Sequence, residues 1–133
     1  VKVLITGANG FLGQNLSVHL SEKKIETVSF TREMSVERLP ECLKGVDFVF
    51  HLAGVNRPKN MDEFETGNKE LTEQLCDAIR VTGRQIPVMY SSSIQADAKN
   101  LYGISKKAAE QSLIALERET GSPVYIYRLP THI

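Results

Sequence analysis

Short apolar runs alternate with longer amphipathic stretches along the whole chain. The apolar runs are rich in β-branched and aromatic residues, which is typical of buried strands, and they cover residues 3–5, 26–31, 46–52, 87–91 and 124–128. Stretches with a helical period separate them. Because strands that are joined through helices usually pair in parallel and are covered on both faces, this alternation predicts an α/β fold.

The two longest amphipathic stretches predict helices. In residues 61–81 the apolar positions fall on one stripe, which consists of Phe64, Leu71, Leu75, Ala78 and Ile79. A second helix is expected over residues 100–120, since Gly121 and Pro123 follow it as a common stop signal. With right-handed crossovers, these elements predict a Rossmann-type, doubly wound parallel sheet of about five strands in three layers.

Length and charge are those of one globular domain, which we expect to span residues 1–133. Sixteen basic residues balance sixteen acidic ones, so no overall field attracts the protein to nucleic acid or to an anionic membrane. No apolar run approaches the ~20 residues of a membrane span. Cys42 and Cys76 lie far apart and away from any histidine cluster, which predicts buried thiols and no metal site. We therefore expect a cytoplasmic protein without nucleic-acid or membrane partners.

Glycines at a fixed spacing follow the first predicted strand. Gly7, Gly10 and Gly13 form a GxxGxxG pattern between this strand and an amphipathic helix. Small residues at such a turn let backbone amides approach a pyrophosphate and let the helix pack closely on the strand. Glycines often only make turns, but this position between a strand and a helix predicts a dinucleotide-binding site.

The residues after the second predicted strand bear on the choice of dinucleotide. A site specific for NAD usually has an acid here, which binds the ribose hydroxyls, whereas an arginine can grip a 2′-phosphate. This chain has Thr31 and Arg32, followed by Glu33. Arg32 therefore favours NADPH. The alternative is that Arg32 is solvated and that Glu33 binds the ribose of NAD.

Three further strand ends contribute candidate residues. After the third strand, Ala53 and Gly54 leave room for a cofactor, and His51 is expected to pack at the strand end. The fourth strand ends in three serines, and Tyr102 and Lys106 follow on one face of the next helix. An ammonium one turn from a phenol favours loss of the phenolic proton. A YxxxK match alone is common by chance, but with the serines and the glycine turn it predicts a Ser–Tyr–Lys site.

These motifs resemble the extended short-chain dehydrogenases/reductases. The resemblance covers the whole chain, with TGANGFLG at residues 6–13, YGISK at residues 102–106 and YIYRLP at residues 125–130. It implies that Ser93, Tyr102 and Lys106 are catalytic, with Ser92 as the alternative to Ser93. The same resemblance implies that Asn68 braces the catalytic strand or a water near the lysine, for which an ordinary polar helix residue is the alternative. It also implies a nicotinamide cofactor held by Gly7, Asn9, Gly10, Phe11, Leu12, Arg32, Leu52, Ala53, Gly54, Asn68 and Lys106.

Within this superfamily, the runs HLAGVNRP at residues 51–58 and SSSIQA at residues 91–96 look most like reductases of bacterial capsule and O-antigen synthesis. The resemblance implies NADPH-dependent reduction of the C4 ketone of a UDP-4-keto-6-deoxy-N-acetylhexosamine, on the route to UDP-N-acetyl-L-fucosamine. It further implies a homodimer, a cupin epimerase domain in the full-length protein, and a UDP-sugar site that includes Asn56, Arg57 and Ser92. For Asn56 and Arg57, a surface turn is the alternative.

Two other functions stay open. A nucleotide-sugar epimerase or dehydratase that recycles its NAD would share the Ser–Tyr–Lys site, although dehydratases tend to place acids where this chain has Ile94 and Gln95. The chain also departs from the family. The path from residue 32 to residue 47 is short, and the segment that leads into the sugar-binding lobe is missing after Pro130. We therefore expect a truncated domain of marginal stability or with a tendency to self-associate. The second of the two other functions is that of an NAD(P)-binding module without activity.

Overall fold

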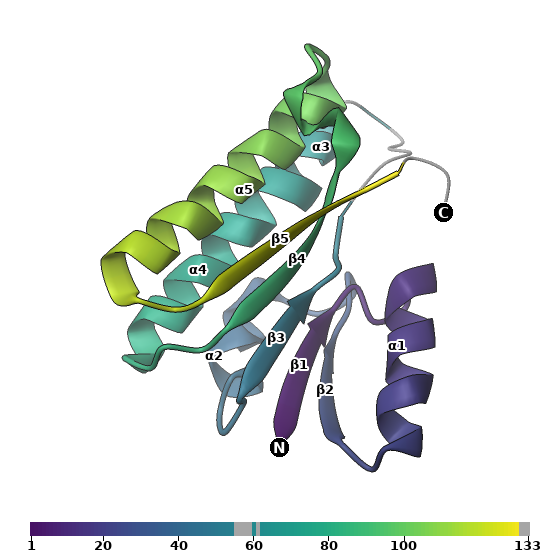
Figure 1. Ribbon diagram of the computed structural model, residues 1–133, viewed down its shortest axis with the longest axis vertical. Helices are drawn as coiled ribbons and strands as arrows, with labels where there is room; N and C mark the ends of the chain where they lie inside the picture. The colour runs from purple at the N-terminus through teal and green to yellow at the C-terminus, as the bar shows by residue number, and fades with distance from the viewer. Residues whose placement is uncertain (55–59, 61, 131–133) are drawn as a thin grey trace.

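A computed structural model describes residues 1–54, 60 and 62–130 (Figure 1). Its centre is a five-stranded sheet in which all neighbouring strands are parallel. The strands lie in the order β2-β1-β3-β4-β5. Their bounds are Lys2–Thr6 for β1, Glu26–Phe30 for β2, Phe48–His51 for β3, Val88–Ser93 for β4 and Val124–Leu129 for β5. The predicted doubly wound parallel sheet is thus confirmed.

Helices cover both faces of the sheet, but they do so unequally (Figure 1). On one face lies α1 (Phe11–Glu22), which contacts β1 and β2. The other face is covered by α2 (Leu39–Cys42), α4 (Leu71–Thr82) and α5 (Leu101–Thr120). Shorter segments connect these elements: η1 (Val36–Arg38), α3 (Asp62–Phe64), the π-helical η2 (Glu65–Glu70) and η3 (Ile94–Asp97).

Two predicted helices are found with small differences. The helix expected over residues 100–120 is α5, whose first turn is capped by Asn100 Oδ1 as it accepts a bond from the amide of Gly103 at 2.7 Å. The helix expected over residues 61–81 consists of α3, η2 and α4 in succession. The short helices η1, α2 and η3 were not expected, because three or four residues are too few to show a period.

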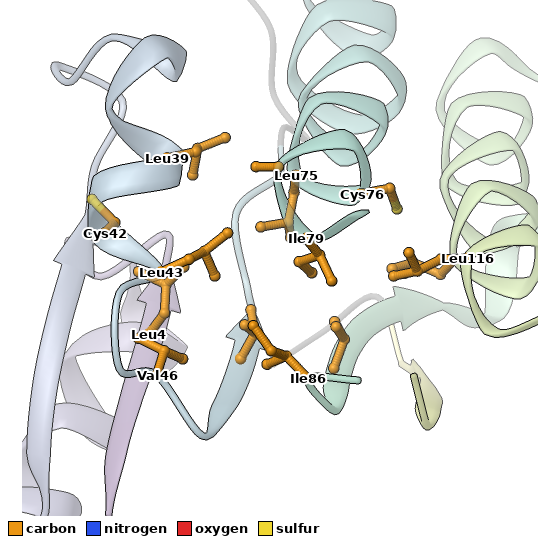
Figure 2. Close-up of a cluster of buried hydrophobic side chains, with 14 of the residues drawn as sticks. Leu4, Leu39, Cys42, Leu43, Val46, Leu75, Cys76, Ile79, Ile86 and Leu116 are labelled. Atoms are coloured by element: carbon orange, nitrogen blue, oxygen red, sulfur yellow. The ribbon is translucent and has the colours of Figure 1, made fainter. Parts of the chain in front are cut away.

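The larger hydrophobic core lies between the sheet and the three helices α2, α4 and α5 (Figure 2). Leu4 and Val49 face it from the sheet, and Leu75, Ile79 and Leu116 face it from the helices. Both cysteines are free and buried in this core, as expected. A smaller cluster of Val3, Ile5, Ala8 and Leu20 lies under α1. No helix in the described part of the chain is both long enough and apolar enough to cross a membrane.

The strand order fixes where a ligand can bind. The chain moves outward from β1 to β2 in one direction and from β3 through β4 to β5 in the other, so the order reverses between β1 and β3. At such a switch point the loops after two adjacent strands turn to opposite faces and open a crevice at the carboxyl ends of the strands. This rule places the expected ligand crevice beyond Thr6 of β1 and His51 of β3.

Candidate functional site

The turn after β1 approaches the end of β3 so closely that only glycine fits. Gly7 has a φ of +68°, and a Cβ at this position would lie 2.6 Å from the amide nitrogen of Ala53. A Cβ at Gly13 would lie 2.2 Å from the carbonyl oxygen of Gly7. The first and third glycines of the pattern therefore provide a left-handed turn and a close packing of α1 on β1.

The N-terminus of α1 opens at this turn. Gly10 occupies the N-cap position, and its amide donates to the carbonyl of Gly7 at 3.0 Å. Since glycine has no side chain with which to cap the helix, the first amides of α1 remain available to an anion. The neighbouring Asn9 and Phe11 are exposed, and Leu12 is half-buried.

The end of β2 lies beside the same turn. The amide of Gly7 donates to the carbonyl of Phe30 at 3.1 Å, which ties the last residue of β2 to the glycine turn. Arg32 follows two residues later and is exposed. The backbone thus places this arginine next to the glycine turn, on the side away from β3.

Residues from three elements converge beyond the end of β3. A Cβ at Gly54 would lie 2.9 Å from Oδ1 of Asn68, in η2, and 3.1 Å from Nζ of Lys106, in α5. Leu52 and Ala53 precede this glycine and are half-buried. The structure therefore brings together three residues that the sequence assigned to the cofactor from positions far apart in the chain.

Lys106 is almost completely buried, with 6% of its surface exposed. Its ammonium group donates to the carbonyl oxygen of Ser91 at 3.1 Å and lies 4.9 Å from the ring centroid of Tyr90. Burial lowers the pKa of Lys106 to about 8, although the carboxylate of Glu110 opposes this shift. A proton on this lysine is therefore held less tightly than on an exposed lysine.

Tyr102 and Ser93 lie at the two ends of the connection between β4 and α5. Ser93 ends β4 and caps η3 by accepting a bond from the amide of Gln95 at 3.1 Å. A Cβ at Gly103 would lie 2.3 Å from the carbonyl oxygen of Gln95, so the first turn of α5 packs directly on η3. Tyr102 is half-buried in this turn, and its ring contacts Phe64 edge-on with centroids 5.6 Å apart.

Of the three residues that the resemblance assigned to the sugar, the structure describes Ser92 alone. Ser92 is buried, and its hydroxyl donates to Oε2 of Glu110 in α5. Because successive residues of a strand point to opposite faces, Ser92 does not share a side of β4 with Ser93. Asn56 and Arg57 lie outside the described residues.

Several buried polar residues connect the strand ends to the helices, and they are Thr6, Thr72, Ser105 and Glu110. Thr6 and Ser105 lie within the two motifs quoted from the sequence, but no role was assigned to them, and Thr72 and Glu110 were not recognised. His51 is fully buried, as expected, between two of these hydroxyls. No signal in the sequence distinguishes these residues, because their partners are brought near only by the fold.

Comparison with known proteins gives a consistent family assignment. A family model described as the NAD dependent epimerase/dehydratase family matches residues 3–133. The chain is 60% identical over 131 residues to the UDP-2-acetamido-2,6-beta-L-arabino-hexul-4-ose reductase of Pseudomonas aeruginosa. This match covers 98% of the chain but 35% of the relative, so the chain spans about a third of that protein's length.

Solved structures show the same architecture. The capsular polysaccharide assembling protein CapF of Staphylococcus aureus is 39% identical, with a TM-score of 0.82 over 96% of this chain and 35% of that one. The UDP-glucuronic acid 4-epimerase of Bacillus cereus, in complex with NAD, is 19% identical, with a TM-score of 0.85. That match covers 98% of this chain and 57% of the epimerase, and at this identity it shows the fold alone.

Proposed function

The chain belongs to the NAD dependent epimerase/dehydratase family, and from this premise we propose that the protein is a nicotinamide-dependent reductase of a UDP-linked 4-keto sugar. The substrate would be a UDP-2-acetamido-2,6-dideoxyhexos-4-ulose, reduced at C4. The observation on which the proposal rests is the 60% identity to a curated reductase over the whole segment that contains Ser93, Tyr102 and Lys106. Because the chain spans about a third of that relative, the proposal concerns the full-length protein.

The glycine turn suits the diphosphate of a dinucleotide. The close approach of Gly7 to Ala53 and the unblocked N-terminus of α1 leave amide donors facing outward, without a side chain in front of them. The ribose and nicotinamide would then extend past Gly54 toward Asn68 and Lys106. The family description names NAD, and the epimerase of Bacillus cereus was solved with NAD.

We propose that the protein prefers NADPH to NADH, and that Arg32 is the reason. This arginine follows β2 at the position where an acid would bind the ribose hydroxyls of NAD. It is exposed and lies next to the glycine turn through the bond between Gly7 and Phe30. A guanidinium group there is free to make a forked, charge-assisted contact with a 2′-phosphate.

The proposed chemistry uses three side chains. When bound, the dihydronicotinamide supplies a hydride to the carbonyl carbon. Tyr102 donates its phenolic proton to the oxygen that becomes the C4 hydroxyl, and Ser93 donates a hydrogen bond to the same oxygen. Lys106, buried one turn from Tyr102, places a positive charge where the phenolate develops.

The remaining parts of the proposal concern partners. A UDP-sugar as substrate agrees with the names of the curated reductase and of the epimerase. Asn56 and Arg57 are proposed to reach the sugar or its diphosphate. In the full-length protein we propose a homodimer and a cupin epimerase domain beyond these 133 residues, in a bacterial cytoplasm.

The proposal is tested by incubating the full-length protein with a UDP-4-keto-6-deoxy-N-acetylhexosamine and NADPH, while the absorbance of the reduced cofactor is followed. A reductase oxidises one NADPH for each alcohol formed. An epimerase or dehydratase forms product without net oxidation, and this outcome would contradict the proposal. Tyr102→Phe should lower kcat by at least about 100-fold, the range for loss of a general acid, while the Kd for NADPH stays unchanged.

The cofactor assignment has its own control. Arg32→Ala should weaken NADPH binding and leave NADH binding unchanged, because only NADPH has the 2′-phosphate. The matched variant is Arg38→Ala, which removes an exposed arginine from η1, a few residues further along the chain. If the wild-type protein binds NADH at least as tightly as NADPH, the role assigned to Arg32 is wrong.

A further inference from the structure

A continuous chain of hydrogen bonds, most of them buried, joins Ala53 at the edge of the sheet to η2. The amide of Ala53 donates to Oγ1 of Thr6 at 3.1 Å, and Oγ1 of Thr6 lies 2.7 Å from Nδ1 of His51. On the other side of the ring, Nε2 of His51 lies 2.8 Å from Oγ1 of Thr72. That hydroxyl in turn donates to the carbonyl oxygen of Asn68 at 2.7 Å.

The direction of every bond in this chain is fixed by counting protons. Thr72 has one hydroxyl proton, and it goes to the carbonyl of Asn68, which can only accept. Nε2 of His51 must therefore carry a proton and donate it to Thr72. In the neutral ring Nδ1 then accepts from the hydroxyl of Thr6, which itself accepts from the amide of Ala53.

The surroundings keep the imidazole neutral and in place. His51 and Thr72 are fully buried, and the ring stacks on Tyr90 with centroids 5.2 Å apart. Burial lowers the pKa of His51 to about 3, and the positive charge of Lys106 acts in the same direction. A neutral histidine offers one donor and one acceptor on opposite sides, and the two hydroxyls use both.

The chain of bonds continues from Asn68 to α5, the helix that bears two of the three proposed catalytic residues. Nδ2 of Asn68 donates to Oγ of Ser105 at 3.0 Å, and Ser105 donates to the carbonyl of Tyr102 at 2.7 Å. Asn68 is 1% exposed. Its backbone is thus held from the β3 side, and its side chain holds the first turns of α5.

We propose that His51 is a positioning residue which, as the Nε2–H tautomer, couples the Gly7–Ala53 edge where the dinucleotide binds to Asn68 and the first turns of α5. The coupling rests on the proposed function, because it assumes that a dinucleotide occupies this edge. Loss of the bond between His51 and Thr72 leaves a buried N–H without an acceptor, and the ring can relieve this only by tilting or by moving its proton to Nδ1, either of which alters its bond with Thr6. A change at Asn68 in η2 or at Thr72 in α4 is therefore expected to change the affinity for the cofactor.

The test compares dinucleotide affinity in three variants of the full-length protein. Thr72→Val keeps the shape of the side chain and removes its hydroxyl, whereas Thr72→Ser keeps the hydroxyl. Thr120→Val is the matched control, because Thr120 also donates to the carbonyl four residues earlier, at 2.7 Å, but lies at the far end of α5. We expect Thr72→Val to weaken NADPH binding about tenfold, within the usual range of coupling between sites, and Thr72→Ser and Thr120→Val to bind as the wild type does.

The tautomer is measured separately, by nitrogen-detected NMR of the imidazoles in ¹⁵N-histidine-labelled protein, with His51→Phe to assign the signals. A neutral Nε2–H ring at pH 6 is expected. An Nδ1–H or a charged ring would overturn the proposal, and so would an unchanged affinity in Thr72→Val or an equal loss in Thr120→Val. If the wild type binds neither NADPH nor NADH, the proposed function and the coupling both fail, while the NMR result still decides the hydrogen-bond chain.

Discussion

At the scale of single residues, burial of Lys106 makes the stability of the cofactor-free protein depend on pH. The pKa of this lysine is about 8 in the folded protein and near 10.5 in the unfolded chain. Between these values the unfolded chain binds a proton that the folded protein lacks, so the free energy of unfolding rises with pH. Relative to Lys106→Met, the wild type should gain about 3 kcal/mol between pH 8 and pH 10.5, measured by urea denaturation.

The exposed Lys99 supplies the control for this measurement. Lys99→Met removes a solvated lysine near the start of α5 and should follow the wild type at every pH. A constant difference between the wild type and Lys106→Met over this range would show that Lys106 keeps its proton in the folded protein. Below pH 8 both folded and unfolded states are protonated at this residue, and no pH-dependent difference is expected.

The residue scale also separates what the sequence predicts from what it does not. Tyr102 and Lys106 are recognisable because four positions along a helix fix their relation locally. Gly7 is recognisable because it lies in a turn that directly follows a strand and directly precedes a helix. The partners of His51, in contrast, lie 45 and 21 residues away along the chain, at Thr6 and Thr72. No local spacing relates them, and a threonine in a helix has no pattern that marks it as buried.

At the scale of elements, an ion pair between the buried Glu110 of α5 and the exposed Arg128 of β5 holds these two elements together. Both oxygens of the Glu110 carboxylate accept bonds from Arg128, at 2.9 and 3.0 Å, and Ser92 of β4 donates a third bond. Burial alone would raise the pKa of Glu110, but the bonds from Arg128 and Ser92 outweigh it and hold the pKa below its usual value. This stability is present above the unfolded pKa of a glutamate and is lost as the pH falls through the lower folded value.

Removing the arginine should therefore be costly. Arg128→Leu leaves the Glu110 carboxylate, which is 3% exposed, with only part of its hydrogen bonds. We expect the free energy of unfolding at pH 7 to fall by roughly 2 kcal/mol, because a buried carboxylate loses two charge-assisted hydrogen bonds although water can reach the place of the exposed arginine. Lys107→Met is the control, since Lys107 pairs with the exposed Asp97 at 3.2 Å and should change stability by less than about 1 kcal/mol. Equal losses in the two variants would contradict the role assigned to Glu110.

The elements themselves were largely predictable. All five strands are present within a few residues of their predicted bounds, because each combines an apolar run with flanking turn residues. The wide π-turn of η2 was not predictable. It turns Asn68 inward, and Thr72 follows in α4 with its hydroxyl bonded to the carbonyl of Asn68. An apolar period gives no signal for polar residues on the buried side of a helix, so the stripe that begins at Phe64 predicted the helix but not its function.

At the scale of the whole molecule, the two faces of the sheet differ in their cover. Beyond α1, the face formed by β3, β4 and β5 opens into a groove of about 740 Å³. Aromatic side chains form much of this groove, among them Phe48, Phe50, Tyr125 and Tyr127. The rings of Phe48 and Tyr125 stack with centroids 6.4 Å apart, and Tyr127 is 55% exposed. Parallel sheets are almost always covered on both faces, so this groove marks a part of the sheet that the described helices leave uncovered.

A polypeptide of these 133 residues is accordingly expected to self-associate through this face. Sedimentation velocity should show a concentration-dependent shift to larger species. Tyr127→Lys places a charge in the middle of the apolar contact and should weaken the association at least about tenfold. Val81→Lys is the matched control, because Val81 is 80% exposed on α4, away from the groove, and its replacement should leave the association unchanged.

A polypeptide that stays monomeric at all concentrations, or that responds equally to both lysines, would show that the groove does not drive contacts between copies. An association that is weakened by Tyr127→Lys alone would mean that the uncovered half of the sheet, rather than exposed apolar residues in general, limits the solubility of this domain.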